Sequence, residues 1–299
     1  MSAFVPGSNV ILCADDFAIA DGVSRGIEEL AQARRLSATS ALVTLPTWST
    51  HAGRLALLRP TLAVGLHVNL TLGAPLGAMP KLGSLGRLPP IGELTQRALL
   101  YRLDVDEIAG EIERQLAQFE LATGFAPDFI DGHQHVHVLP QVRTALLQVL
   151  QRRFPAGSPQ RRLLLVRNPA DTIAAIYRRG VVPGKALVIA GLARGFADAV
   201  RRAGFTTNAG FSGASAFDVA VPYARELARF FAIPGGCHLV MCHPGYPDEA
   251  LARLDPHTDR RRQELDAIMA ADGLVEALWH IDRRRAGPAP MWPGRENAA

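Results

Sequence analysis

Short apolar runs alternate with amphipathic segments along most of this chain. The run Val10–Ala14 ends at a polar pair, and the segment Val23–Leu36 that follows repeats apolar residues at helical spacing. Continuous apolar runs of this length are typical of strands buried on both faces of a parallel sheet, and the 3.6-residue repeat is typical of helices that pack on such a sheet. The pattern therefore predicts repeated strand–helix units.

The same alternation recurs further along the chain. Helices are expected at Val105–Thr123 and Gln141–Arg152. Further strands are expected over five apolar runs: Ala38–Leu45, Leu62–Leu70, Phe129–Asp131, Leu163–Arg167 and Leu239–Cys242. This order predicts a TIM-barrel-like (β/α) barrel of parallel strands, in a regular, distorted or incomplete form. We expect residues 1–285 to form a single catalytic barrel domain, and residues 286–299, with three prolines and no periodicity, to be a flexible tail.

Composition and charge fit a globular protein with one large core. Of 299 residues, 48% are hydrophobic and 20% are charged, without a low-complexity tract, which argues against disorder. The net charge of +4 comes from scattered arginines that have no aromatic residues between them, so no nucleic-acid partner is expected. Three cysteines without a CxxC pair, and an N-terminus unlike a signal peptide, predict a cytoplasmic protein with reduced thiols.

One segment, Val181–Arg202, combines an apolar stretch with Lys185, Arg194 and Arg201. It is too interrupted to span a bilayer, but a basic, apolar segment can lie in a lipid headgroup layer. Peripheral membrane contact is therefore one interpretation. An ordinary barrel helix with basic flanks is the other, and the glycines within the segment favour it. A homodimer is compatible with the sequence.

Polar side chains gather immediately after the predicted strands. Asp15 and Asp16 close the first strand, His67 lies in the third, and His243 follows the last. Since the carboxyl ends of parallel barrel strands meet on one face, these side chains should converge there. Two adjacent carboxylates on a strand point in different directions, so one can bind a metal while the other faces the substrate. A helix N-cap is the structural alternative for that pair.

A run of histidines follows the strand that ends at Asp131. In Asp131-Gly-His-Gln-His-Val-His137 the histidines are two residues apart, and on an extended segment they would share one face, which is costly unless a metal or a substrate binds them. Asp131 is either an acceptor that orients a ligating imidazole or a turn residue. We expect His135 and His137 to contact substrate or to support the ligands. His243, before a Pro-Gly turn, is either a turn residue or an acid–base group that protonates a leaving amine.

Taken in order, these motifs resemble those of the YdjC-like carbohydrate deacetylases, which include chitooligosaccharide deacetylases and hopanoid-associated relatives. The resemblance runs from about residue 9 to residue 270 and rests on five stretches: Ala14-Asp-Asp-Phe17, Leu36-Ser-Ala-Thr-Ser40, Gly65-Leu-His67, Asp131-Gly-His-Gln-His-Val-His137 and Cys242-His-Pro-Gly245. It implies a TIM-barrel-like fold. One departure is Ala18, where many relatives have glycine; it reshapes the first loop and leaves the choice of substrate open.

Carried onto this sequence, the resemblance implies one divalent metal ion, Mg²⁺ or Zn²⁺, held by Asp16, His67 and His133. It also implies that Asp15 is the general base and that His243 protonates the departing amine. The implied reaction removes the N-acetyl group of an N-acetylated sugar, either an oligosaccharide or a lipid-carrier-linked aminosugar. Two alternatives are another metal-dependent hydrolase, such as a phosphoesterase, and a non-catalytic sugar-binding protein. The first would usually need ligands for a second metal, and the second has no need for Asp15 beside Asp16.

Overall fold

The computed structural model of the chain describes residues 4–255, 258–281 and 292–293. The expected flexible tail, residues 286–299, lies outside the described residues apart from Trp292 and Pro293, and Trp292 is buried. The three cysteines form no disulfide with one another. Within the described ranges, no helix is both long enough and apolar enough to cross a bilayer.

A single sheet of parallel strands forms the centre of the fold, in the order β5-β4-β3-β2-β1-β7-β6. The strands are β1 (Ile11–Phe17), β2 (Ala38–Ala41), β3 (Ala63–Val68), β4 (Phe129–Gly132), β5 (Leu165–Val166), β6 (Gly210–Ser212) and β7 (His238–Cys242). Every strand residue is buried, as expected of a sheet covered on both faces. Six of the strands fall on predicted apolar runs. The sequence analysis missed β6, because Gly-Phe-Ser contains one large apolar residue and gives no apolar run.

The sheet curls into an incomplete barrel. Its edge strands are β5 and β6, and the segment just before β6 bends toward β5: Leu165 forms a parallel bridge with Thr206, and the amide of Val166 donates to the carbonyl of Thr206 at 2.8 Å. The predicted barrel of parallel strands is therefore confirmed in its incomplete form, with seven strands in the described part of the chain.

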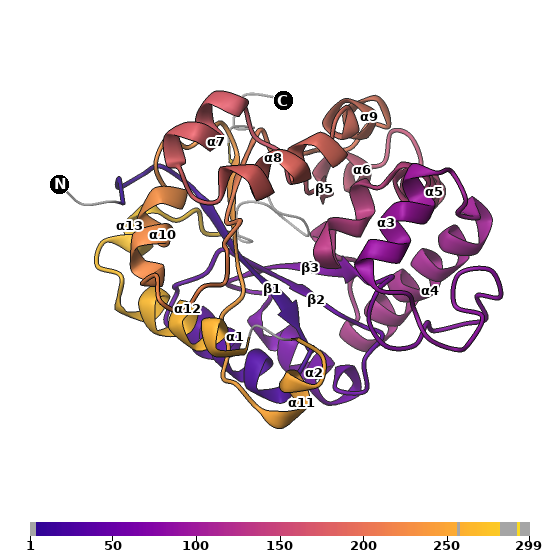
Figure 1. Cartoon of the computed structure of the whole chain (residues 1–299), viewed down its shortest axis with the longest axis horizontal. Coiled ribbons are helices and arrows are strands. Elements are labelled where there is room, and N and C mark those ends of the chain that lie inside the picture. Colours follow the sequence, from indigo (N-terminus) through magenta and orange to yellow (C-terminus); the bar gives the residue numbers. More distant parts are fainter. Residues whose placement is uncertain (1–3, 256–257, 282–291, 294–299) are drawn as a thin grey trace.

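Helices surround the curled sheet (Figure 1). The predicted helix at 105–123 is present with those bounds, and the helices predicted near 23–36 and 141–152 differ by a few residues at their ends. The helices are α1 (Asp21–Gln32), α2 (Trp48–Leu58), α3 (Ile91–Leu99), α4 (Val105–Thr123), α5 (Pro140–Arg153), α6 (Pro159–Leu163), α7 (Ile173–Arg179), α8 (Pro183–Leu192), α9 (Phe196–Arg202), α10 (Tyr223–Phe230), α11 (Glu249–Ala252), α12 (Thr258–Ala270) and α13 (Leu274–Ala277).

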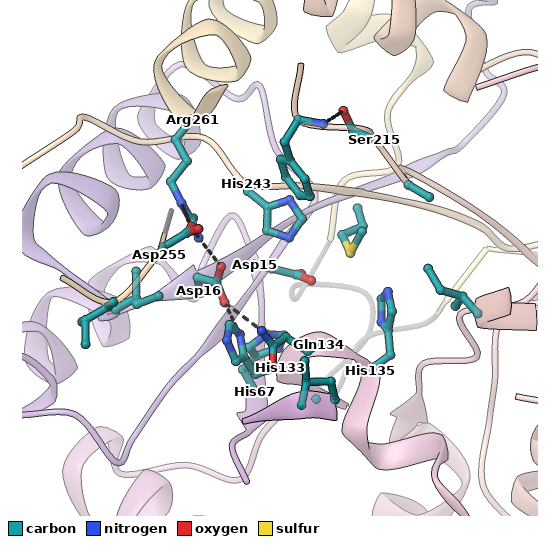
Figure 2. Close-up of a pocket in the computed structure, with 18 of the residues that line it drawn as sticks. Asp15, Asp16, His67, His133, Gln134, His135, Ser215, His243, Asp255 and Arg261 are labelled. Atoms are coloured by element: carbon teal, nitrogen blue, oxygen red, sulfur yellow. Dashed lines mark hydrogen bonds and ion pairs between the residues drawn. The ribbon is translucent and has the colours of Figure 1, made fainter. Parts of the chain in front are cut away.

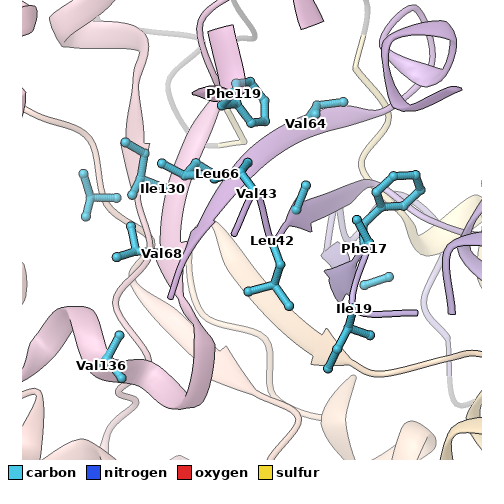
Figure 3. Packing of buried hydrophobic residues seen from close by; sticks show 14 of the residues in the cluster. Phe17, Ile19, Leu42, Val43, Val64, Leu66, Val68, Phe119, Ile130 and Val136 are labelled. Carbon is cyan, nitrogen blue, oxygen red and sulfur yellow. The ribbon is translucent and has the colours of Figure 1, made fainter. Parts of the chain in front are cut away.

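The core divides into two parts because successive strand residues point to opposite faces of the sheet. One set packs outward under the helices, as Leu66 and Ile130 do in Figure 3. The other set forms a second, smaller cluster, which we place inside the barrel. It includes Ile11 and Cys13 of β1, Ala63 of β3, Phe129 of β4, and the stacked indoles of Trp279 and Trp292.

The inward-facing positions turn from apolar to polar toward the carboxyl ends of the strands. In β1 the inward series continues from Ile11 and Cys13 to Asp15, and in β3 it runs from Ala63 through Gly65 to His67. Gly65 is required here, because a Cβ at this position would lie 2.6 Å from the ring of Phe129. The alternation thus places charged side chains inside one mouth of the barrel.

Candidate functional site

A cavity of about 400 Å³ opens at the carboxyl ends of the strands. Figure 2 shows Asp15 and Asp16, from the end of β1, and His243, which follows β7, pointing into it. Of the residues that the sequence singles out, the cavity is lined by Asp15, Asp16, His67, His133, His135 and His243. The other two, Asp131 and His137, are fully buried and are not part of its lining.

Asp16 lies at the centre of a compact group of side chains that could hold a metal ion. Its Oδ1 is 3.3 Å from Nε2 of His67 and 2.9 Å from Nδ1 of His133, and one ligand atom from each of the three residues falls within 4.8 Å of the others. The register of β1 shifts between Ala14 and Phe17, and Asp16 has a φ of 69°. Such a left-handed residue costs about 1–3 kcal/mol, and strain of this kind concentrates at functional sites.

His67 is oriented by Asp131, as the sequence analysis allowed. The two residues are partners on the adjacent strands β3 and β4, and Nδ1 of His67 lies 2.6 Å from Oδ1 of Asp131. Burial by itself would lower the pKa of His67, but the adjacent Asp131 carboxylate raises it to about 10. Because Nδ1 is held by Asp131, Nε2 is the nitrogen directed at Asp16.

Asp15 forms an ion pair that the sequence analysis missed. Arg167, which follows β5, is fully buried and donates to both carboxylate oxygens of Asp15 at 2.6 Å. The same guanidinium lies 2.6 Å from Oδ2 of Asp131 and donates to Sγ of Cys13 at 3.0 Å. Cys13, Asp15 and Asp131 could by spacing form a second metal site, but the guanidinium of Arg167 already occupies the space between them.

The histidine run departs from the expected extended geometry. Residues His133–Val138 form a 3₁₀ segment, in which Gln134 and His135 have positive φ values of 53° and 60°. The expectation that the three imidazoles share one face is therefore wrong, because two left-handed residues rotate them apart.

Each of the three histidines consequently has a different environment. His133 faces Asp16, whereas His135 lines the cavity and packs edge-on against Phe211. His137 is buried, and its Nε2 donates to the carbonyl oxygen of Arg167 at 2.8 Å. Burial lowers the pKa of His137 to about 4, so the ring is neutral near pH 7. His137 thus supports Arg167 and does not face the cavity.

His243 lies across the cavity mouth from the histidine run (Figure 2). Its ring packs edge-on against Phe217, with 5.5 Å between the centroids, and its backbone amide donates to Oε2 of Glu264 at 2.5 Å. Burial lowers the pKa of His243 to about 4, so the imidazole rests in its neutral form near pH 7.

Arg261 of α12 is the second charged residue that the sequence analysis missed. Its Nη2 lies 2.6 Å from Oδ2 of Asp16 and 2.7 Å from Oδ2 of Asp255. Burial by itself would raise the pKa of Asp16, but His133 and Arg261 together hold it well below its usual range. The carboxylate therefore stays ionised inside the protein.

Ala18 has a φ of 66°, in the left-handed region that favours glycine. A left-handed L-residue costs about 1–2 kcal/mol, and the greater freedom of glycine in the unfolded chain offsets about 0.4–1 kcal/mol of that. We therefore expect Ala18→Gly to raise the free energy of unfolding by about 0.5–1 kcal/mol in urea titrations. Ala14→Gly, in the buried strand β1, is the matched control and should destabilise the protein. A loss of stability in Ala18→Gly would contradict the argument.

Comparison with known proteins gives one family match and two groups of similar chains. A family model described as YdjC-like protein matches residues 9–274. Two relatives are named chitooligosaccharide deacetylase. The one from Serratia marcescens is 38% identical over 174 residues, and the one from Yersinia pestis (strain Pestoides F) is 40% identical over 137 residues. The matches cover 55% and 44% of this chain but only 66% and 52% of the respective relatives.

Among solved structures, a protein from Enterococcus faecalis V583 named for cellobiose-phosphate cleavage is similar over 90% of this chain and 93% of its own. The TM-score is 0.65 at 22% sequence identity. This likeness concerns the fold.

Proposed function

Because this chain belongs to the YdjC-like family, we propose that it is a metal-dependent hydrolase that removes the acetyl group from an N-acetylated sugar. The observation that carries the proposal is the pairing of two carboxylates at the end of β1: Asp16 faces two imidazoles, and Asp15 is held by a buried arginine. The names of the two chitooligosaccharide deacetylases support an acetylated oligosaccharide as the first candidate substrate.

The group formed by Asp16, His67 and His133 fits a divalent metal ion. One carboxylate oxygen and two imidazole nitrogens suit Zn²⁺, Fe²⁺, Co²⁺ or Mn²⁺, and a site that keeps water ligands also admits Mg²⁺. A metal-ligating histidine usually gives its other nitrogen to a carboxylate, as His67 does to Asp131. When bound, such an ion polarises a carbonyl oxygen and makes a water molecule more acidic.

Asp15 and His243 would move the proton that the reaction requires. Water adds its oxygen to the acetyl carbon, the C–N bond breaks, and the proton lost by the water reaches the nitrogen of the sugar. Asp15 is the acceptor, and Arg167 fixes both of its oxygens. Since burial keeps His243 neutral near pH 7, the proton that it passes to the amine is the one that Asp15 took from the water, and its transfer returns Asp15 to the carboxylate form.

Two features of the site favour this proposal over its alternatives. A two-metal phosphoesterase would need a second set of ligands. The other such group in the described part of the chain is Cys13, Asp15 and Asp131, and the guanidinium of Arg167 lies against all three. A non-catalytic sugar-binding protein would have no use for a buried arginine that holds both oxygens of Asp15 at the cavity, because burying such a pair stabilises a fold little or not at all.

The decisive experiment measures amine release from N-acetylated sugars, with chitooligosaccharides of increasing length as the first panel. We expect release in the presence of Zn²⁺, Co²⁺ or Mg²⁺, its loss after treatment with a chelator, and its return when metal is added back. A matched panel of phosphate monoesters tests the phosphoesterase alternative. Hydrolysis of phosphate monoesters alone, or amine release that survives complete metal removal, would refute the proposal.

A lipid-carrier-linked aminosugar is the second candidate substrate, and α8 favours it. This helix is apolar, none of its residues is buried, and Val188 is 64% exposed while Ile189 lines the cavity. We expect the protein to float with anionic liposomes at low salt, and Val188→Glu to weaken that flotation. If the wild-type protein stays in the soluble fraction at low salt, a soluble oligosaccharide is the substrate to pursue.

A further inference from the structure

One turn of α12 contacts both the end of β1 and the loop after β7, the two segments that carry the proposed chemistry. Arg261 and Glu264 are three residues apart, so they lie on the same side of the helix, and both are buried. Arg261 reaches Asp16 in the segment that ends β1, and Glu264 reaches His243 just after β7. The strands β1 and β7 are neighbours in the sheet. A single helix is thus in contact with both sides of the cavity.

The contact with Arg261 gives the two carboxylate oxygens of Asp16 different partners. Oδ2 accepts a hydrogen bond from Arg261 at 2.6 Å, which leaves Oδ1 to face the imidazoles of His67 and His133. Arg261 is itself held by Asp255, whose Oδ2 lies 2.8 Å from Nε. Because Oδ2 is engaged, the carboxylate cannot rotate freely, and a single oxygen is presented to the metal-binding group.

Arg261 has two opposing effects on a metal ion at this site: its charge repels the ion, and its hydrogen bond orients Asp16 to bind the ion. A lone guanidinium next to the site would repel a divalent cation. Here Asp255 balances that charge at hydrogen-bond distance, so the repulsion is largely cancelled and the orienting effect remains. Partners that orient metal ligands in this way typically change metal affinity by about 10–100-fold.

The contact with the loop after β7 consists of two hydrogen bonds. Oε2 of Glu264 accepts from the amide of His243 at 2.5 Å, and the carbonyl oxygen of Arg261 accepts from the amide of Gly245 at 3.1 Å. These bonds fix the His-Pro-Gly turn at both ends. The next residue along the helix, Arg262, points outward and pairs with Asp266 on the surface.

We propose that Arg261 and Glu264 are positioning residues with separate targets: Arg261 orients Asp16 toward a metal ion, and Glu264 orients His243 toward the substrate. This inference rests on the proposed function, since it assumes the metal site and the role of His243. It predicts that changes at Arg261 lower metal affinity and that changes at Glu264 lower kcat. If α12 had only a structural role, changes at the two residues would have the same effects.

The role of Arg261 is tested by measuring Co²⁺ binding. Calorimetry gives the affinity, and the visible absorption of the bound ion reports its coordination. We expect Arg261→Met to weaken Co²⁺ binding by about 10–100-fold and to alter the spectrum, because Oδ2 of Asp16 becomes free to bind. Arg261→Lys retains the charge without the forked geometry, so its Co²⁺ affinity should lie between those of the wild type and Arg261→Met. It replaces the Met variant in the test if that protein does not fold. Arg262→Met is the matched control and should bind Co²⁺ like the wild type.

The role of Glu264 is tested by steady-state kinetics on a chitooligosaccharide. We expect Glu264→Met to lower kcat by up to about 10²-fold, with KM and Co²⁺ affinity unchanged, because a displacement of about 1 Å at a reacting group can have that effect. Glu264→Gln should restore kcat, since its amide oxygen can still accept from His243. Glu264→Asp, which withdraws the carboxylate by one methylene, replaces the Met variant if that protein does not fold.

The outcomes separate the inference from the proposed function. A wild-type protein that binds no Co²⁺ and releases no amine overturns both. If the wild type binds Co²⁺ but Arg261→Met and Arg261→Lys bind it equally well with the same spectrum, the role of Arg261 is refuted. If Glu264→Met keeps its kcat, or loses Co²⁺ affinity in parallel with kcat, the role of Glu264 is refuted.

Discussion

Replacing Asp15 by asparagine should lower turnover by about 10²–10⁴-fold while the protein still binds its metal ion. The amide cannot accept the proton of the attacking water, whereas Asp16, His67 and His133 keep their donor atoms. Asparagine has nearly the same shape, so the loss would report on the proton acceptor and not on packing. Rates of amine release at saturating substrate, with metal content measured on the same samples, provide the test.

Asp21→Asn is the matched control for this variant. The side chain of Asp21 is 77% exposed at the start of α1, near the same strand end, and it pairs with His51 outside the cavity. We expect its turnover to equal that of the wild type. Near-wild-type turnover in Asp15→Asn, with metal bound, would mean that another group accepts the proton, and His135 would then be the first candidate within the cavity.

Replacing Arg167 by methionine should destabilise the protein by about 3–5 kcal/mol. The guanidinium has 0% exposure and neutralises two buried carboxylates, those of Asp15 and Asp131. Its removal leaves both charges without their counterion in a region from which water is excluded. This is a large share of the 5–15 kcal/mol that typically stabilises a folded protein. The free energy of unfolding in urea at pH 7 measures the effect.

Two further variants make the Arg167 result specific. Arg167→Lys retains the charge but lacks the planar fork that donates two parallel hydrogen bonds to Asp15, so it should recover part of the stability and little of the turnover. Arg201→Met removes an arginine whose partner Asp198 is on the surface, and it should change stability by less than about 0.5 kcal/mol. An Arg167→Met protein as stable as Arg201→Met would contradict the argument that the two buried carboxylates need this counterion.

The positions of the strands and the residues at their carboxyl ends followed from local pattern. Buried parallel strands are continuous apolar runs, so the runs Val10–Ala14 and Leu239–Cys242 predicted β1 and β7, and the polar residues after them marked one mouth of the barrel. The same pattern could have revealed Arg167, which ends the predicted run Leu163–Arg167 just as His67 lies within an earlier one. Because arginine is common on surfaces, its place at the end of a strand does not by itself mark a site residue. The sequence analysis therefore placed Arg167 in the strand and not in the site.

What the sequence alone determined about this protein is the order of six of its strands and of helices α1, α4 and α5, and which mouth of the barrel holds the polar side chains, because apolar runs and the 3.6-residue repeat are local properties of the chain. Only the tertiary structure decided which of these side chains face one another. Arg261 lies 245 residues from Asp16 along the chain, and left-handed turns at Gln134 and His135 send three evenly spaced histidines in three directions. Such pairings depend on how distant elements pack, and no local pattern encodes that.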